Sequence, residues 1–128
     1  GGVPKGLPAL VKALRMQEKA RGAGFDWEKP EQVWEKVQEN LNELHIEVES
    51  KESAEKIEGE FGDLLFALIN YGRFIGINPE NALEKTNQKF LRRFNYMEEK
   101  ITSGGKSLAD CKLDEMDVFW NEAKKKGL

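Results

Sequence analysis

Apolar residues recur at helical spacing over long blocks of this chain, and that pattern restricts the fold to helices. From Val33 to Val48, successive valines and leucines are separated by four, four, three and four positions. This spacing places them on one face of an α-helix. No stretch alternates apolar and polar residues long enough to indicate a β-strand. The sequence therefore predicts an all-α fold.

Glycine and proline residues mark where the predicted helices end. Ser53 is expected to cap one helix, and Asn78 with Pro79 to begin the next. The predicted helices cover Leu7–Ala20, Glu31–Glu49, Ala54–Ile75, Pro79–Ile101 and Asp114–Lys125. A chain of 128 residues has the size of one ordinary domain. We therefore expect a single helical domain over residues 1–128.

The predicted helix Ala54–Ile75 is apolar on most of its sides. Residues of its main stripe are Ile57, Phe61, Leu64, Leu65, Leu68 and Ile69, and residues outside the stripe are Phe66, Ala67 and Phe74. So many apolar faces exceed what one thin helical bundle can cover. We therefore expect a helical bundle that is completed by dimerisation of two identical chains.

Composition excludes several classes of function. The net charge is −3 and no segment is basic throughout, so we expect no nucleic-acid partner. The least charged stretch, Phe61–Gly72, is too short for a membrane span and carries Asp63. The first five residues do not have the pattern of a secretory signal peptide. The only cysteine, Cys111, cannot form an internal disulfide and fits a reducing compartment. We expect a cytoplasmic protein.

Two carboxylates on the apolar third helix indicate a metal site. Glu60 and Asp63 are three positions apart and share one helix face. Neighbouring carboxylates beside a core repel each other, and a divalent cation with oxygen ligands, such as Mg²⁺, relieves that repulsion. In the alternative interpretation, the two acids form ion pairs with Lys56, Lys89 or Arg93.

Helical geometry also sorts the polar residues of the second helix. At 100° per residue, Asn40 lies roughly 60° from the centre of the apolar stripe, Glu47 roughly 80° and Glu43 roughly 120°. These residues form a strip beside the core. Glu39 lies roughly 160° away and is expected to point into solvent.

On the fourth helix, the same calculation separates the cations. Lys89 and Arg93 are expected to border the core, where they are able to bind phosphate or acidic side chains, and Arg92 is expected to be solvated. In the loop after the first helix, Phe25 and Trp27 either anchor the loop or stack on a base.

The chain resembles the C-terminal domain of the MazG nucleoside triphosphate pyrophosphohydrolases. The segments that carry this resemblance are Gly24–Trp27, Glu60–Phe66 and Asn87–Phe94. The family signature is Glu-Glu-x-x-Glu followed, after a spacer, by Glu-x-x-Asp. Glu43, Glu60 and Asp63 match it, but Asn40 stands where the family has a metal-binding glutamate.

The resemblance implies an all-α dimeric fold and Mg²⁺-dependent hydrolysis of a nucleoside triphosphate to a monophosphate and pyrophosphate, with Mn²⁺ as a second candidate metal. It implies that the metal ligands are Asn40, Glu43, Glu60 and Asp63, the last three also being catalytic. It implies further that the substrate contacts are Lys89, Arg93, Trp120 and Lys124.

Two other interpretations remain open from the residues. One is a metal- and nucleotide-binding or regulatory module with little hydrolysis, because an uncharged Asn40 contributes less to a metal site than a glutamate. The other is a purely structural helical dimer whose acids only form ion pairs.

Overall fold

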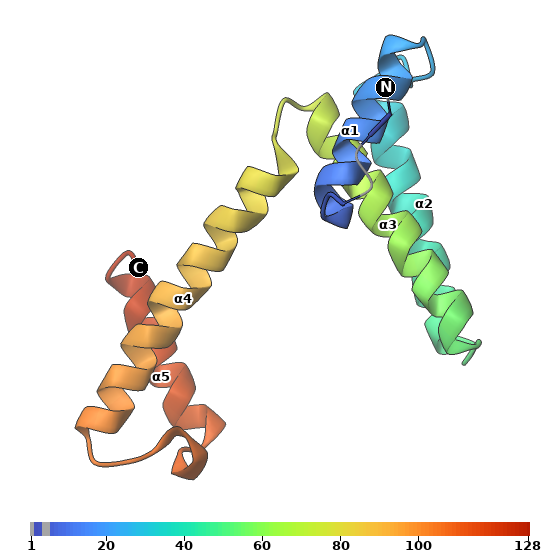
Figure 1. Ribbon diagram of the computed structural model, residues 1–128. Coiled ribbons are helices and arrows are strands. Elements are labelled where there is room, and N and C mark those ends of the chain that lie inside the picture. The colour runs from blue at the N-terminus through green and yellow to red at the C-terminus, as the bar shows by residue number, and fades with distance from the viewer. Residues whose placement is uncertain (1, 4–5) are drawn as a thin grey trace. The chain divides into compact units, whose positions relative to one another are not determined.

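The computed structural model describes residues 2–3 and 6–128, and within them it contains α-helices, one short 3₁₀ helix and no strand. Residues 1, 4 and 5 of the N-terminal segment considered above lie outside the described residues. The elements are α1 (Ala9–Gly22), α2 (Pro30–Glu49), α3 (Ala54–Phe74), α4 (Pro79–Ser103), η1 (Leu108–Asp110) and α5 (Leu113–Lys125) (Figure 1). The predicted all-α fold is confirmed. None of the described helices is both long enough and apolar enough to cross a membrane.

Local signals account for the helix boundaries, which lie within two residues of those predicted. The Ser53 hydroxyl accepts a hydrogen bond from the Lys56 N–H at 3.2 Å, so it caps α3 as expected. Beyond the end of α3, Gly76 has φ of +79°, a left-handed conformation that favours glycine. The 3₁₀ helix η1 was not predicted; the Ser107 hydroxyl donates to Asp110 there at 2.9 Å.

The chain divides into two compact units, one ending at Glu80 and the other comprising Asn81–Leu128. The first unit holds α1, α2 and α3, and the second holds most of α4 together with η1 and α5. Each unit is described by itself here. The expectation of a single domain over residues 1–128 stays a prediction.

In the first unit, α2 packs along α3, and α1 packs against α3 as well (Figure 1). Val33 and Val37 of α2 are buried, as are Ala67 and Ile69 of α3. Two polar residues, Gln17 of α1 and Asn40 of α2, are buried with them. α3 is therefore the helix that both neighbours share.

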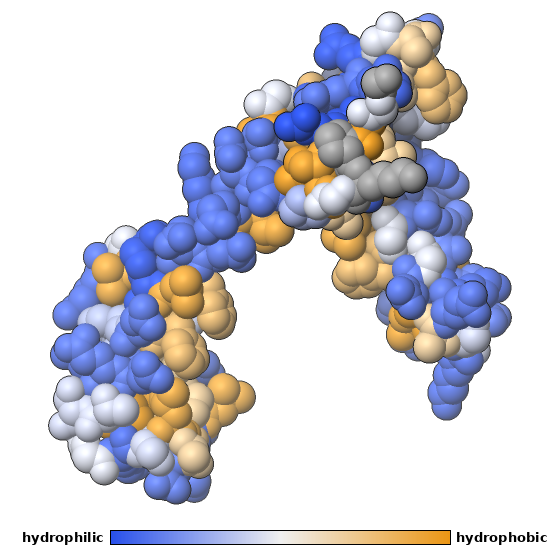
Figure 2. Space-filling model, viewed as in Figure 1, coloured by the Kyte–Doolittle hydropathy of each residue, from blue (hydrophilic) through white to orange (hydrophobic). Residues whose placement is uncertain are grey.

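One chain buries only part of the apolar stripe predicted for α3. Phe61, Leu65 and Leu68 of that stripe are each about half exposed, at 48–50%. Ala67, which was placed outside the stripe, is buried. The reason is that α1 and α2 cover only part of a helix that is apolar nearly all round. Figure 2 shows apolar residues, coloured orange, exposed on the visible face.

In the second unit, side chains of α4 and α5 pack together. Met97 and Ile101 of α4 and Ala123 of α5 are buried. The ring of Phe90 lies 5.3 Å from that of Trp120, centroid to centroid. Aromatic and apolar contacts therefore join the two helices of this unit.

Candidate functional site

The acids predicted for a metal site come from two helices that pack on each other. Glu43 and Glu47 lie on α2, and Glu60 and Asp63 lie on α3. Glu43, Glu47 and Glu60 are half-buried, whereas Asp63 is exposed. The packing of α2 along α3 thus gathers acidic residues that are distant in sequence.

The Glu60 carboxyl is partly desolvated and lies near other acids. Burial raises the pKa of the Glu60 carboxyl above its ordinary value, and the charges of Glu43 and Asp63 raise it further, with a smaller effect from Glu47. Its Oε2 atom is buried and has no hydrogen-bond partner in the part of the chain that the structure describes. A desolvated carboxylate among other acids fits a divalent cation, which prefers such oxygen ligands.

The acids are not gathered around one point in this arrangement. Among residues 2–3 and 6–128, no group of three or more His, Cys, Asp or Glu side chains has the spacing of a metal site. The donor chemistry therefore fits a metal, and binding would require the side chains to move closer together.

Lys56, one cation of the ion-pair interpretation, forms its ion pairs with other acids, and the charge of Glu60 has a smaller effect on its pKa. Lys56 Nζ lies 3.2 Å from Glu47 Oε2 and 3.8 Å from Glu52 Oε1, so its ion-pair partners are these residues. Glu39 is exposed, and its Oε1 lies 3.4 Å from Lys36 Nζ. The expectation that Glu39 points into solvent is confirmed.

Asn40 lies deeper than expected. It is only 4% exposed, and its Nδ2 donates a hydrogen bond to the backbone carbonyl of Asp63 at 3.3 Å. The side chain therefore lies inside the contact between α2 and α3. Its predicted role as a metal ligand stays a prediction.

The predicted substrate contacts all belong to the second unit. On α4, Lys89 is exposed, while Arg93 is half-buried and its Nε donates to the backbone oxygen of Leu128 at 2.8 Å. On α5, Trp120 is half-buried against Phe90, and Lys124 is exposed. Of these predicted contacts, Lys89 and Lys124 are exposed, and Arg93 is hydrogen-bonded to the backbone of Leu128.

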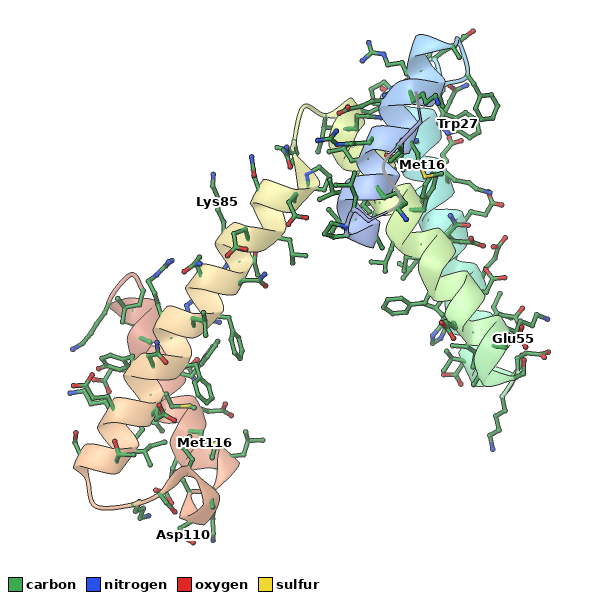
Figure 3. The ribbon with its side chains drawn as sticks, viewed as in Figure 1. Met16, Trp27, Glu55, Lys85, Asp110 and Met116 are labelled. Atoms are coloured by element: carbon green, nitrogen blue, oxygen red, sulfur yellow. The ribbon has the colours of Figure 1, made fainter. Side chains whose placement is uncertain are left out.

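Sequence reasoning missed a pocket in the first unit. Its volume is about 410 Å³, and its walls come from α1, the loop before α2, and α3. Figure 3 labels Met16 and Trp27, which both line it. The other lining residues are Gln17, Ala20, Phe25, Asp26, Phe66, Asn70 and Arg73. Most of this wall is apolar, which suits a flat organic group.

An ion pair joins the loop before α2 to α3. Arg73 Nη2 lies 2.8 Å from Asp26 Oδ1, and Nη1 lies 3.1 Å from Oδ2. Asn70 Oδ1 accepts two further hydrogen bonds from Arg73. Phe25 is 84% exposed and Trp27 47% exposed. The local sequence around Asp26 gave no signal that Arg73, 47 positions away, is its partner.

Comparison with known proteins finds relatives that match nearly the whole chain. No family model matches it. It is 46% identical over 118 residues to the nucleoside triphosphate pyrophosphohydrolase/pyrophosphatase MazG of Thermotoga maritima, covering 92% of this chain and 45% of that protein. It is 36% identical over 124 residues to the nucleoside triphosphate pyrophosphohydrolase of Escherichia coli K12, covering 96% of this chain and 47% of that protein.

A third relative is the uncharacterized protein YabN of Bacillus subtilis, which is 51% identical over 122 residues, 95% of this chain and 25% of that protein. The chain spans about half the length of the two pyrophosphohydrolases that it matches. The two pyrophosphohydrolase matches extend over 92% and 96% of the chain, so they cover residues of both units. The chain is therefore a MazG-like all-α domain.

Proposed function

We propose that this domain hydrolyses nucleoside triphosphates to the monophosphate and pyrophosphate, using a divalent cation. The observation that carries the proposal is the desolvated carboxyl of Glu60 on α3, whose pKa is raised by Glu43 of α2 and by Asp63, in a chain similar to named pyrophosphohydrolases. Mg²⁺ is the proposed metal, and Mn²⁺ is a substitute with similar oxygen preference.

The carboxylates of Glu43, Glu60 and Asp63 are the proposed metal ligands. A bound cation would polarise phosphate oxygens and lower the pKa of the attacking water. The unpartnered Oε2 of Glu60 supports this assignment, because a buried anionic oxygen without a donor is costly unless a cation binds it.

Residues of the second unit are proposed to contact the substrate. Lys89 and Arg93 would neutralise phosphate charge, since cations stabilise the negative charge that phosphoryl chemistry carries. Trp120 and Lys124 are proposed to contact the nucleotide. In the first unit, the pocket beside Trp27 is a candidate site for the base, because aromatic side chains stack on flat rings.

The exposed apolar residues of α3 support a homodimer as the working form. Phe61, Leu65, Phe66 and Leu68 are each about half exposed, and a second copy of the chain would cover them. We propose a cytoplasmic homodimer with a nucleoside triphosphate substrate and no nucleic-acid or membrane partner.

The first experiment is hydrolysis of a panel of ribo- and deoxyribonucleoside triphosphates with Mg²⁺ or Mn²⁺. The assay must separate monophosphate and pyrophosphate from diphosphate and phosphate. Asp63→Asn should abolish turnover, whereas Glu39→Gln, which changes an exposed acid on α2, should retain it. Absence of monophosphate and pyrophosphate from every substrate would contradict the proposed activity.

One observation favours a second candidate, a metal- and nucleotide-binding module with little turnover. Asn40 is uncharged, and its amide is hydrogen-bonded to the α3 backbone. The site therefore holds one anionic ligand fewer than it would with a glutamate at position 40. Turnover that appears only in Asn40→Glu would favour this candidate.

A further inference from the structure

Two buried carboxamides hold α3 by its backbone. Gln17 on α1 is 6% exposed, and its Nε2 donates to the carbonyl oxygen of Phe66 at 3.0 Å. Asn40 on α2 is 4% exposed, and its Nδ2 donates to the carbonyl oxygen of Asp63 at 3.3 Å. The two acceptors are three positions apart, which is about one helical turn. Both neighbouring helices therefore bond to the backbone of α3 within about one helical turn.

The chemistry of the acceptors determines how the two amides are oriented. A carbonyl oxygen only accepts, so the NH₂ group of each amide must face it. Inside a helix, that carbonyl also accepts the N–H four residues later, and the amide uses its second lone pair. The hydrogen bonds from the two amides are thus additional to the backbone bonds within α3. They help to set the position of α3 relative to α1 and α2.

The hydrogen bonds of Gln17 and Asn40 affect the position of α3 because hydrogen bonds are directional and the surrounding apolar contacts are not. Val33 and Val37 of α2 and Ala67 of α3 are small apolar side chains, whose contacts fix the position of two helices less sharply than a hydrogen bond does. A hydrogen bond fails when its donor and acceptor move by a fraction of a helical turn.

The bond from Asn40 acts where the acidic group lies. Asp63 supplies both the accepting carbonyl and one of the proposed metal-binding carboxylates, and Glu43 follows Asn40 by three positions on α2. This contact therefore joins the backbone of α3 at Asp63 to the turn of α2 that precedes Glu43.

We propose that Asn40 is a positioning residue and not a metal ligand. Its amide, together with that of Gln17, holds α3 so that the Asp63 carboxylate stays within reach of Glu43. This inference rests on the proposed function, in which these carboxylates bind a divalent cation.

The test measures Mn²⁺ binding to the metal-free full chain by titration calorimetry, with the melting temperature of each variant as a check on folding. Asn40→Leu and Gln17→Met remove the N–H donors and nearly conserve size. Each should weaken Mn²⁺ binding by about tenfold, as loss of a residue that orients ligands does elsewhere. Asn42→Leu, an exposed position on α2, is the matched control and should leave binding unchanged.

Asn40→Asp separates positioning from coordination. It adds a negative charge but loses the donor, so positioning predicts no gain in Mn²⁺ affinity. If residue 40 were a metal ligand, the Asn40→Asp variant would bind Mn²⁺ about tenfold or more tightly, because metal affinity rises with the charge of the ligands. Tighter binding by Asn40→Asp therefore overturns the inference.

Other outcomes are equally decisive. Unchanged affinity in folded Asn40→Leu, or in folded Gln17→Met, overturns the inference while leaving the proposed function intact. No Mn²⁺ binding by the unmodified chain at millimolar concentration overturns the metal site itself, and the inference with it. Because the two donors lie on different helices, one folded variant suffices for the test.

Discussion

Asp26→Asn tests whether one ion pair holds the loop before α2 against α3. The Asp26 carboxylate receives two hydrogen bonds from Arg73, at 2.8 and 3.1 Å. The variant conserves shape and removes the charge. Asn70 still accepts from Arg73, so the guanidinium keeps a partner in the variant. The measured loss should therefore come mainly from the Arg73–Asp26 pair.

The expected magnitude follows from burial. The side chains of Arg73 and Asp26 are 10% and 17% exposed. Exposed pairs contribute about 0–1 kcal/mol, and breaking a fully buried pair costs about 3–5 kcal/mol. For this pair we expect a loss of about 2 kcal/mol in the free energy of unfolding. In a chain of this size that lowers the melting temperature by roughly 8 °C.

The pH dependence has a defined sign. The hydrogen bonds from Arg73 lower the pKa of the Asp26 carboxyl most; burial opposes them, and the Trp27 N–H and the charges of Arg73 and Arg21 lower it further. A carboxyl with a lowered folded-state pKa stabilises the fold above its unfolded value, about 3.8. The difference between wild type and Asp26→Asn should therefore be constant near neutral pH and shrink as pH falls through the lowered pKa.

Urea unfolding and thermal melts measure both effects. Arg21→Gln is the matched control, because Arg21 Nε lies 3.9 Å from the same carboxylate but its side chain is 72% exposed. We expect the control to lose less than about 0.5 kcal/mol. An equal loss in both variants, or a loss in Asp26→Asn below that value, would refute the burial argument.

Three further predictions concern other parts of the chain. Ser53→Ala should cost about 1 kcal/mol in urea unfolding, because it removes the hydrogen bond that caps α3; no change would contradict the cap. Glu60→Gln should raise the melting temperature of the metal-free protein and remove Mn²⁺ binding, since it neutralises a desolvated acid among other acids; a lower melting temperature would count against this. Burial and the Glu115 charge raise the pKa of the Cys111 thiol, so Glu115→Gln should speed its alkylation by iodoacetamide at mildly alkaline pH. An unchanged alkylation rate would contradict that cause.

Helix boundaries were predictable because their signals are local. The Ser53 cap, the proline that begins α4 and the apolar spacing of α2 all act within one or two turns. The buried side of α3 was not predictable in the same way. A helix that is apolar nearly all round has no single preferred face, so Ala67 outside the predicted stripe is buried while Phe61 on the stripe is half exposed.

The candidate site shows the same division. Helical angles placed Glu39 outside the acidic group, and the structure agrees because an angle around one helix depends on local geometry alone. The burial of Asn40 and its bond to the Asp63 carbonyl depend on how two helices meet, which no spacing within α2 encodes. The partnership of Asp26 with Arg73 spans 47 positions and carries no local signal either.

Taken by itself, the sequence determined the helices, the face on which each acid lies, and the resemblance to MazG-like domains, because these follow from short-range spacing and from residue identity. The tertiary structure alone decided which side of α3 is covered, which residue holds the loop, and what the Asn40 amide bonds to. Those outcomes arise from contacts between distant segments, where the packing of whole helices selects among partners that the local sequence leaves equivalent.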